Sequence, residues 1–243
     1  MPTDATRVEL AVRRANRDDV EEISDLYLAT RRAAVPAMPP QIHTRTEVLE
    51  HTAAEVRDKE VWVAVDPGDG AVLAFLVLTD TWLDSLYVGP DHQGRGVGTV
   101  LLELAKAERP AGYSLWVFAS NAPARAFYHR HGLVELEHTD GSGNEEGSPD
   151  VRMAWPGTDP MVFLRAQIDE VDDDLALLLA RRLALTAVIQ GFKPTPGQEG
   201  RDPAREQEIA RRMARHAPGL GEEAVARIMH VVIGESLDAC EDH

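Results

Sequence analysis

The chain of 243 residues is longer than one typical domain, and 44% hydrophobic with 27% charged residues is the composition of a folded globular protein. A formal net charge of −16 opposes non-specific attraction to nucleic acid or anionic lipid, and no stretch approaches the roughly 18 consecutive apolar residues of a membrane span. The single cysteine, Cys240, excludes an internal disulfide, and the first residues carry no apolar stretch typical of a signal peptide. We therefore expect two domains in the cytoplasm, with no nucleic-acid or membrane partner.

The first 157 residues alternate strand-like and helix-like stretches, which is typical of an α/β fold. The turn formers PGDG at 67–70 separate two apolar runs and predict a hairpin within an antiparallel meander. The stretch 138–150 is rich in turn formers, and we interpret it as a hairpin loop rather than a linker because a strand-like run follows it. The expected strands are 7–15, 60–66, 71–80, 82–88, 113–119, 133–138 and 151–155, and the expected helices are 18–34, 44–58, 99–107 and 122–131.

Strand signals disappear beyond residue 157, where three helices are expected at about 160–192, 203–216 and 221–239. The first would be roughly 50 Å long at 1.5 Å per residue, against a radius of gyration of about 12 Å for an 85-residue domain. Such a helix must cover its apolar seam against something else, and a homodimer of long helices is the simple solution. The seam comprises Leu164, Ile168, Val171, Leu175, Leu178, Leu179, Leu185 and Ile189. We place the domains at 1–157 and 158–243.

The sharpest motif is a glycine-rich turn between an expected strand and an expected helix. Its residues are Gln93, Gly94, Arg95, Gly96, Val97 and Gly98. Glycines let the backbone approach a pyrophosphate closely, and the free amides and dipole at a helix N-terminus favour its negative charge. Taken alone, the motif is equally compatible with an ordinary strand-to-helix turn. A second motif, Asn121 to Tyr128, opens the next expected helix.

Together, DSLYVGPDHQGRGVGTVLLELAK and NAPARAFYHRHGLVE resemble the GNAT acyltransferase superfamily, over about residues 7–157. The resemblance implies a mixed-sheet fold and acetyl-CoA as cosubstrate for the N-acetylation of an amine that the sequence does not identify. It implies that the backbone of residues 86–88 pairs with the pantetheine arm, that the amides of residues 93–99 hold the pyrophosphate, and that Asn121 contacts the cofactor arm. The implied cofactor contacts are Leu86, Tyr87, Val88, Gln93, Gly94, Arg95, Gly96, Val97, Gly98, Thr99 and Asn121.

By the same resemblance, Tyr128 is the general acid that protonates the leaving thiolate. The alternative for Tyr128 is a half-buried core aromatic. The general base is less visible because its position varies in this superfamily. Asp84 is a candidate on the right strand, with a surface carboxylate as the alternative role.

Charged residues at helical spacing predict a polar pocket in the second part. At about 100° per residue, Arg182 and Lys193 project within roughly 20° of each other, whereas Arg165 lies about 100° round the axis from Arg182. One ligand would therefore meet all three most easily if Arg165 came from a partner chain. Two further sets share a helix face by their spacing: Asp202 with Arg205 and Glu206, and Ser236 with Cys240. For each set, a solvated helix face is the alternative.

The stretches LRAQIDEVDDDLALLLARRLALTAVIQGFK, GRDPAREQEIARRM and VVIGESLDA resemble the all-α, three-helix AroQ-type chorismate mutases, over residues 162–240. The resemblance implies an intertwined helical dimer with two equivalent sites. It also implies rearrangement of chorismate to prephenate, on the shikimate route to aromatic amino acids, with no metal or cofactor. Arg182 and the partner's Arg165 would clamp the two carboxylates, and Lys193 would donate to a carboxylate and the ether oxygen. The remaining implied contacts are Asp202, Arg205 and Glu206 at the hydroxyl end of the ring, and Ser236 near a carboxylate.

One position departs from this family. Cys240, a weak hydrogen-bond donor, stands where the family commonly has Gln or Glu bonding the ether oxygen. The departure leaves three alternatives open: a mutase or pyruvate lyase acting on 4-amino-4-deoxychorismate or isochorismate, binding without turnover, and a regulatory or dimerisation module for the acetyltransferase. The leading hypothesis is a bifunctional enzyme that takes acetyl-CoA, an amine and a chorismate-like diacid.

Overall fold

The computed structural model describes residues 9–195 and 197–241. It divides into two compact units, residues 1–164 and 165–243. The long helix α5 (Pro160–Gln190) begins in the first unit and continues through the second. None of the helices in the described ranges is long and apolar enough to cross a membrane.

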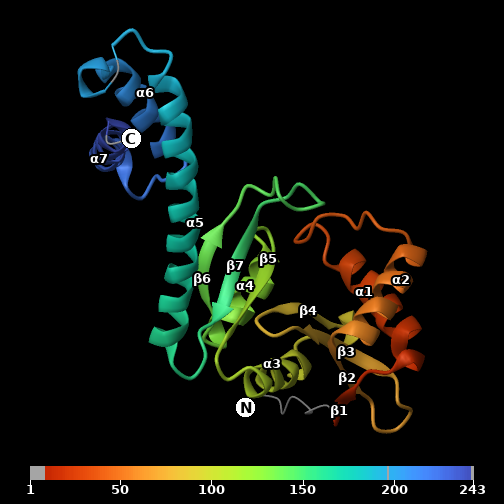
Figure 1. The fold of residues 1–243 in the computed structure, drawn as a ribbon. Helices are drawn as coiled ribbons and strands as arrows, with labels where there is room; N and C mark the ends of the chain where they lie inside the picture. Colours follow the sequence, from red (N-terminus) through yellow and green to blue (C-terminus); the bar gives the residue numbers. More distant parts are fainter. Residues whose placement is uncertain (1–8, 196, 242–243) are drawn as a thin grey trace, which may run out of the picture. The chain divides into compact units, whose positions relative to one another are not determined.

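The first unit contains two antiparallel sheets, in the orders β1-β2-β3-β4 and β5-β7-β6 (Figure 1). The expected meander is confirmed, because the turn at 67–70 joins two paired strands. The closing hairpin is also confirmed, because the strands on either side of residues 139–149 pair with each other. The strands are β1 Ala11–Arg14, β2 Glu60–Val65, β3 Val72–Leu78, β4 Leu83–Val88, β5 Tyr113–Phe118, β6 Val134–His138 and β7 Asp150–Trp155.

Helices cover both faces of the first sheet. On one face Ile23 of α1 (Val20–Ala33) packs among the apolar side chains of β2 and β3, and α2 (Arg45–Asp58) lies beside α1 (Figure 1). On the other face α3 (Val97–Glu108) buries Leu101 and Leu102 in the main core, to which α4 (Ala122–Arg130) also contributes. Thr44 and Glu47 cap α2 reciprocally, which explains why that helix begins at Arg45. The elements are those expected of an α/β domain with a mixed arrangement of sheets.

The second unit is helical throughout its regular elements, as expected. Beyond the C-terminal part of α5 lie α6 (Pro203–Ala214) and α7 (Gly221–Glu241), which pack together around Ala210, Val225 and Met229 (Figure 1). Asp202 caps α6 by accepting hydrogen bonds from the amides of Ala204 and Arg205. This small core leaves most of α5 without cover from its own unit.

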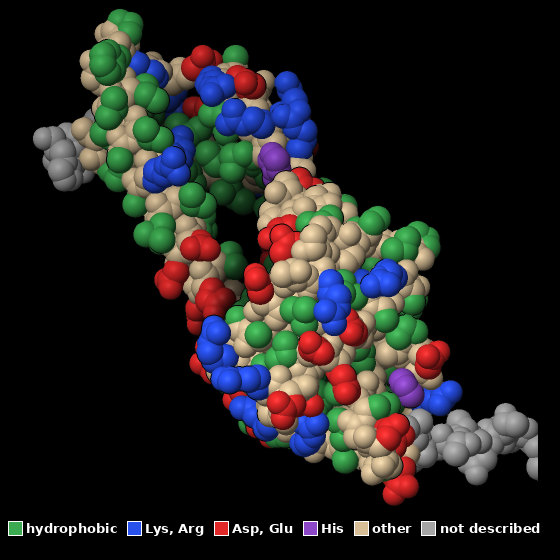
Figure 2. Space-filling model, turned by 90° about the vertical axis from the view of Figure 1, so that its right-hand side faces the viewer, with side chains coloured by type: hydrophobic (Ala, Val, Ile, Leu, Met, Phe, Trp, Pro, Cys, Tyr) green, Lys and Arg blue, Asp and Glu red, His purple; other side chains and the backbone are tan. Residues whose placement is uncertain are grey.

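The apolar seam of α5 is exposed in the single chain. No described residue of α5 is buried, and apolar side chains are visible along the helical part of the surface in Figure 2. Of the eight seam residues expected from the sequence, Leu164 is partly buried, and the exposed ones are Ile168, Val171, Leu175, Leu178, Leu179, Leu185 and Ile189. Apolar surface of this extent is typical of a helix that packs against another chain.

Candidate functional sites

A cavity of about 1410 Å³ opens where the two sheets of the first unit separate. β4 and β5 are joined at their beginnings, where Trp82 and Ser114 form a parallel bridge and the Ser114 amide donates to the Thr81 carbonyl at 2.9 Å. Further along they belong to different sheets, and both line the cavity. Peptide groups on this side of β4 therefore face space rather than a neighbouring strand, which would allow an extended ligand to pair with them.

The glycine-rich turn lines the same cavity, at the N-terminus of α3. Gly94 and Gly96 have φ values of 70° and 86°, a left-handed conformation that a residue with a Cβ adopts only with strain. Gly96 is the N-cap, so no side chain caps the first turn of α3 and its amides stay available to a ligand. The turn has the geometry that anion binding requires: an approachable backbone at the positive end of a helix dipole.

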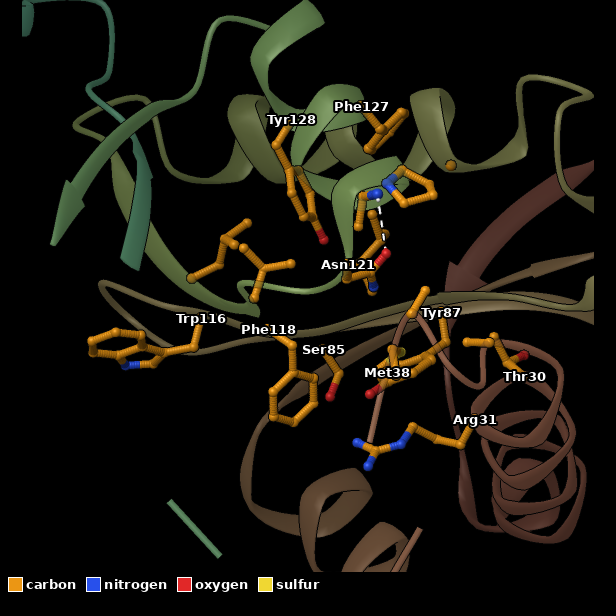
Figure 3. A pocket seen from close by; sticks show the side chains of 18 of the residues that line it. Thr30, Arg31, Met38, Ser85, Tyr87, Trp116, Phe118, Asn121, Phe127 and Tyr128 are labelled. Atoms are coloured by element: carbon orange, nitrogen blue, oxygen red, sulfur yellow. Dashed lines mark hydrogen bonds between the residues drawn. The ribbon is translucent and has the colours of Figure 1, made fainter. Parts of the chain in front are cut away.

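Tyr128 lies on α4, and its hydroxyl points into the cavity (Figure 3). The side chain is only 8% exposed, and its ring packs edge-on against Phe127. Burial raises the pKa of Tyr128, so the phenol keeps its proton at neutral pH. A neutral phenol directed into a cavity can donate a proton to an anion formed there.

Two other predicted cofactor contacts already have partners within the protein. The Asn121 side chain caps α4 by accepting a hydrogen bond from the Ala124 amide at 3.2 Å (Figure 3). The Gln93 side chain donates to the Val88 carbonyl at 3.1 Å. Asn121 retains its amide donors, whereas a ligand that pairs with the Val88 carbonyl must share it with Gln93 or displace Gln93.

The candidate base Asp84 lines the cavity but is ion-paired. Its carboxylate accepts from the ammonium of Lys59 at 2.8 Å, and Lys59 also contacts Glu55 at 3.2 Å. Proton abstraction by Asp84 would require this ion pair to rearrange, so the geometry gives Asp84 no advantage as a base.

A buried ion pair in the cavity was not predicted from the sequence. Arg31, in the last turn of α1, is 3% exposed, and its Nη2 donates to Oε1 of Glu146 at 2.9 Å. The two residues are 115 positions apart, and Glu146 lies in the loop between β6 and β7. Nothing local in the sequence distinguishes either residue from an ordinary surface charge.

In the second unit, Arg182 and Ser236 come together from α5 and α7. Nη1 of Arg182 donates to Oγ of Ser236 at 2.8 Å, and Ser236 in turn donates to the Val232 carbonyl at 2.6 Å. Ser236 is 8% exposed. The sequence predicted both residues at one site, and they lie 54 positions apart.

Three other predicted residues of this unit are hydrogen-bonded within the protein. Nζ of Lys193 donates to the Gly200 carbonyl at 2.6 Å, and Asp202 serves as the cap of α6. Glu206 accepts two hydrogen bonds of 2.8 Å from Arg201, which hold the pKa of Glu206 below its usual range. Arg201 was not among the residues predicted from the sequence, although it directly precedes Asp202.

Three predicted residues stand apart from these contacts. Arg205 pairs with Glu208 on an exposed surface, and Cys240 is a partly buried free thiol one turn beyond Ser236. Arg165 is exposed and lies 17 residues before Arg182 on the same continuous helix, about 26 Å along its axis. A small diacid cannot span that distance, so these two arginines cannot meet one ligand within a single chain.

Comparisons with known proteins find two different families in two parts of the chain. The model of the acetyltransferase (GNAT) domain family matches residues 57–135, and that of chorismate mutase type II matches residues 164–240. The peptidyl-lysine N-acetyltransferase YjaB of Salmonella typhimurium is 30% identical over 124 residues, covering 50% of this chain and 81% of that protein. YjaB of Escherichia coli is 28% identical over 148 residues, covering 61% of this chain and 98% of that protein.

A solved structure shows the same fold. The solution structure of apo YjaB from Escherichia coli has a TM-score of 0.52 and 24% identity, covering 62% of this chain and 99% of that one. The YjaB relatives are thus similar to the first unit, and a separate family model matches the second. The chain belongs to the GNAT acetyltransferases through its first unit, and its second unit matches the family model of the type II chorismate mutases; both are families of enzymes.

Proposed function

We propose that the chain is a bifunctional enzyme whose first domain, about residues 1–157, transfers the acetyl group of acetyl-CoA to a primary amine. The observation that carries this proposal is the cavity between β4 and β5, which is lined by both the glycine turn and Tyr128. The amides of residues 97–99 would bind the pyrophosphate, and the open edge of β4 would pair with the pantetheine arm.

Besides the two substrates, the proposed reaction needs only Tyr128 and water. The amine nitrogen attacks the thioester carbonyl, a C–N bond forms, and the C–S bond breaks. Tyr128 protonates the departing thiolate, and water takes the proton released by the amine, because Asp84 is engaged with Lys59. The named function of the YjaB relatives suggests a lysine side chain as one acceptor of this chemical type.

Calorimetric titration with acetyl-CoA tests the cofactor site. Gly96→Glu should weaken binding at least tenfold, because it places a carboxylate and a strained side chain where the pyrophosphate would bind. Gly70→Glu is a matched control: Gly70 has a φ of 78°, and a Cβ there would meet nothing within 4 Å, as at Gly96. Equal affinities of wild type and Gly96→Glu would refute this placement of the pyrophosphate.

For the second domain, about residues 158–243, we propose rearrangement of chorismate to prephenate. The supporting observation is the contact of Arg182 with Ser236, which directs a cation and a hydroxyl to one place from two helices. Lys193 and Glu206 would complete the site by exchanging their present protein partners for the ligand. Because Arg165 lies too far along α5, the clamp for the second carboxylate would come from the partner's Arg165.

The exposed seam of α5 supports the homodimer that this arrangement requires. A second copy would cover the seam and deliver Arg165 at the same time, which fits the self-complementary contact of a twofold dimer. The molecular mass in solution, measured by light scattering, should be twice that of one chain.

Consumption of chorismate, followed by its near-ultraviolet absorbance with identification of the product, tests the second activity. Arg182→Met should abolish it, whereas Arg181→Met, an exposed neighbour on α5, should not. Because Cys240 leaves the substrate open, 4-amino-4-deoxychorismate and isochorismate serve as parallel substrates. If none of the three is consumed, the second unit is a ligand-binding or dimerisation module and the bifunctional proposal is wrong.

A further inference from the structure

Arg31 is a buried cation in the cavity, and the proposed acetyl transfer gives it no role. Its Nη2 donates to Glu146 and, at 3.3 Å, to the Pro39 carbonyl. Its Nε is buried and has no hydrogen-bond partner among the described residues. Figure 3 shows the guanidinium beside Met38 and Tyr87, in the same cavity that receives the Tyr128 hydroxyl.

The surroundings of Arg31 keep it charged and poorly hydrated. The guanidinium carbon lies 5.9 Å from the ring centre of Tyr27 and 5.4 Å from that of Phe118. Burial alone lowers the pKa of Arg31, but the nearby Tyr87 and Tyr27 and the bond to Glu146 outweigh burial, and the net shift is upward. A buried cation with an open donor is costly unless an anion satisfies it.

Glu146 supplies such an anion only in part. Within the described residues, Nη2 is the guanidinium nitrogen of Arg31 that donates to Glu146, although a guanidinium and a carboxylate can form two parallel hydrogen bonds. Glu146 lies on the irregular loop 139–149, whereas Arg31 is fixed in a helix. A ligand carboxylate could therefore replace Glu146 or join it as a second anion on the guanidinium.

We propose that the acceptor of the acetyl group is an amino acid: a primary amine that carries its own carboxylate, which Arg31 binds. The proposal rests on acetyl transfer in this cavity and names the class of acceptor. Aromatic and apolar groups around the arginine favour an apolar or aromatic side chain on that amino acid. In the reaction the amine nitrogen forms the C–N bond and the C–S bond breaks, while the carboxylate stays unchanged on Arg31.

Matched acceptors test the proposal. Each amino acid found in proteins is assayed as the acceptor with acetyl-CoA. Its activity is compared with that of the amine formed by its decarboxylation, for example phenethylamine for phenylalanine, and with that of a lysine peptide with blocked ends. Loss of charge-assisted hydrogen bonds of this kind costs roughly 10- to 100-fold in affinity. The amino acid should therefore exceed its decarboxylated partner in kcat/KM by that factor, mainly through KM.

Three variants locate the effect. Arg31→Met should remove the preference for the carboxylate, whereas Arg32→Met, the exposed neighbour on α1, should keep it. Glu146→Gln should lower the KM for amino acids, because it frees the guanidinium from a competing anion. If the ion pair only fixes the loop, Glu146→Gln should raise that KM instead, which makes the sign decisive even if Arg31→Met folds poorly.

The outcomes separate this proposal from the acetyl transfer on which it rests. Failure of the wild-type protein to bind acetyl-CoA in calorimetry would refute the acetyl transfer itself. Binding of acetyl-CoA combined with equal or better use of phenethylamine or of the blocked lysine peptide would refute the amino-acid acceptor alone. Binding of acetyl-CoA without acetylation of any carboxylate-bearing amine would refute it equally.

Discussion

Replacing Tyr128 by phenylalanine removes one hydroxyl from the cavity and leaves the ring in place. That hydroxyl points into the cavity, and because burial raises its pKa it carries its proton at neutral pH, so the proton is available to a thiolate formed there. Loss of a general acid costs about 10²- to 10⁴-fold in rate. At 1.36 kcal/mol for each factor of ten, the barrier should rise by about 2.7 to 5.4 kcal/mol.

Steady-state acetyl transfer, measured by release of free thiol from acetyl-CoA, gives the relevant kcat. The Tyr128→Phe variant should lose activity in kcat while its calorimetric affinity for acetyl-CoA changes little, since the proton is needed only as the C–S bond breaks. Tyr113→Phe is the control, because Tyr113 is also buried and its hydroxyl has no partner among the described residues. A Tyr128→Phe enzyme with at least one third of the wild-type kcat would refute Tyr128 as the acid.

Three further changes test the remaining parts of the account. Mixing Arg165→Ala with Arg182→Ala chains should restore chorismate turnover toward half of wild type, because one site of the mixed dimer keeps both arginines; no recovery despite proven subunit exchange would rule out shared sites. Cys240→Gln should raise the mutase kcat, because an amide is a stronger donor to the ether oxygen than a thiol, and an unchanged or lower kcat would argue against this position. Asp19 accepts two hydrogen bonds from Arg13, which lower the pKa of Asp19, so Asp19→Asn should cost about 1–2 kcal/mol of unfolding free energy at pH 7. Since a depressed carboxyl pKa stabilises only above the ordinary value near 4, that difference should shrink as the pH falls from about 5 to about 2, and a constant difference would contradict the ion pair.

The elements of the fold were largely predictable because their signals are local. The strand runs on either side of the turn at 67–70 and the periodic stretch at 160–190 carry their own pattern, and the structure has β2, β3 and α5 there. The N-terminal strand expected at 7–15 is observed only at Ala11–Arg14, and its first residues lie outside the described ones. Boundaries elsewhere shift by one or two residues, which is the usual fraying of helix and strand ends.

The candidate sites were predictable where a motif is continuous in the chain, or where a family resemblance links distant residues, as it does Arg182 and Ser236. The turn at 93–98 and the position of Tyr128 on α4 follow from short segments. The pair of Arg31 and Glu146 does not, because 115 residues separate two ordinary charges that only the packing of α1 against the β6–β7 loop brings together. The roles of Asn121 and Asp202 as helix caps were readable from the sequence, because each directly precedes an expected helix start, where Asn and Asp are preferred caps.

The most direct test of the central claim, two independent active sites in one chain, is to assay acetyl transfer and chorismate turnover in the same preparations of wild type, Tyr128→Phe and Arg182→Met. The wild type should have both activities, Tyr128→Phe should lose only acetyl transfer, and Arg182→Met should lose only chorismate turnover. A wild-type protein that binds acetyl-CoA and chorismate but turns over only one of them, or a variant that loses both activities while remaining folded, would contradict the account.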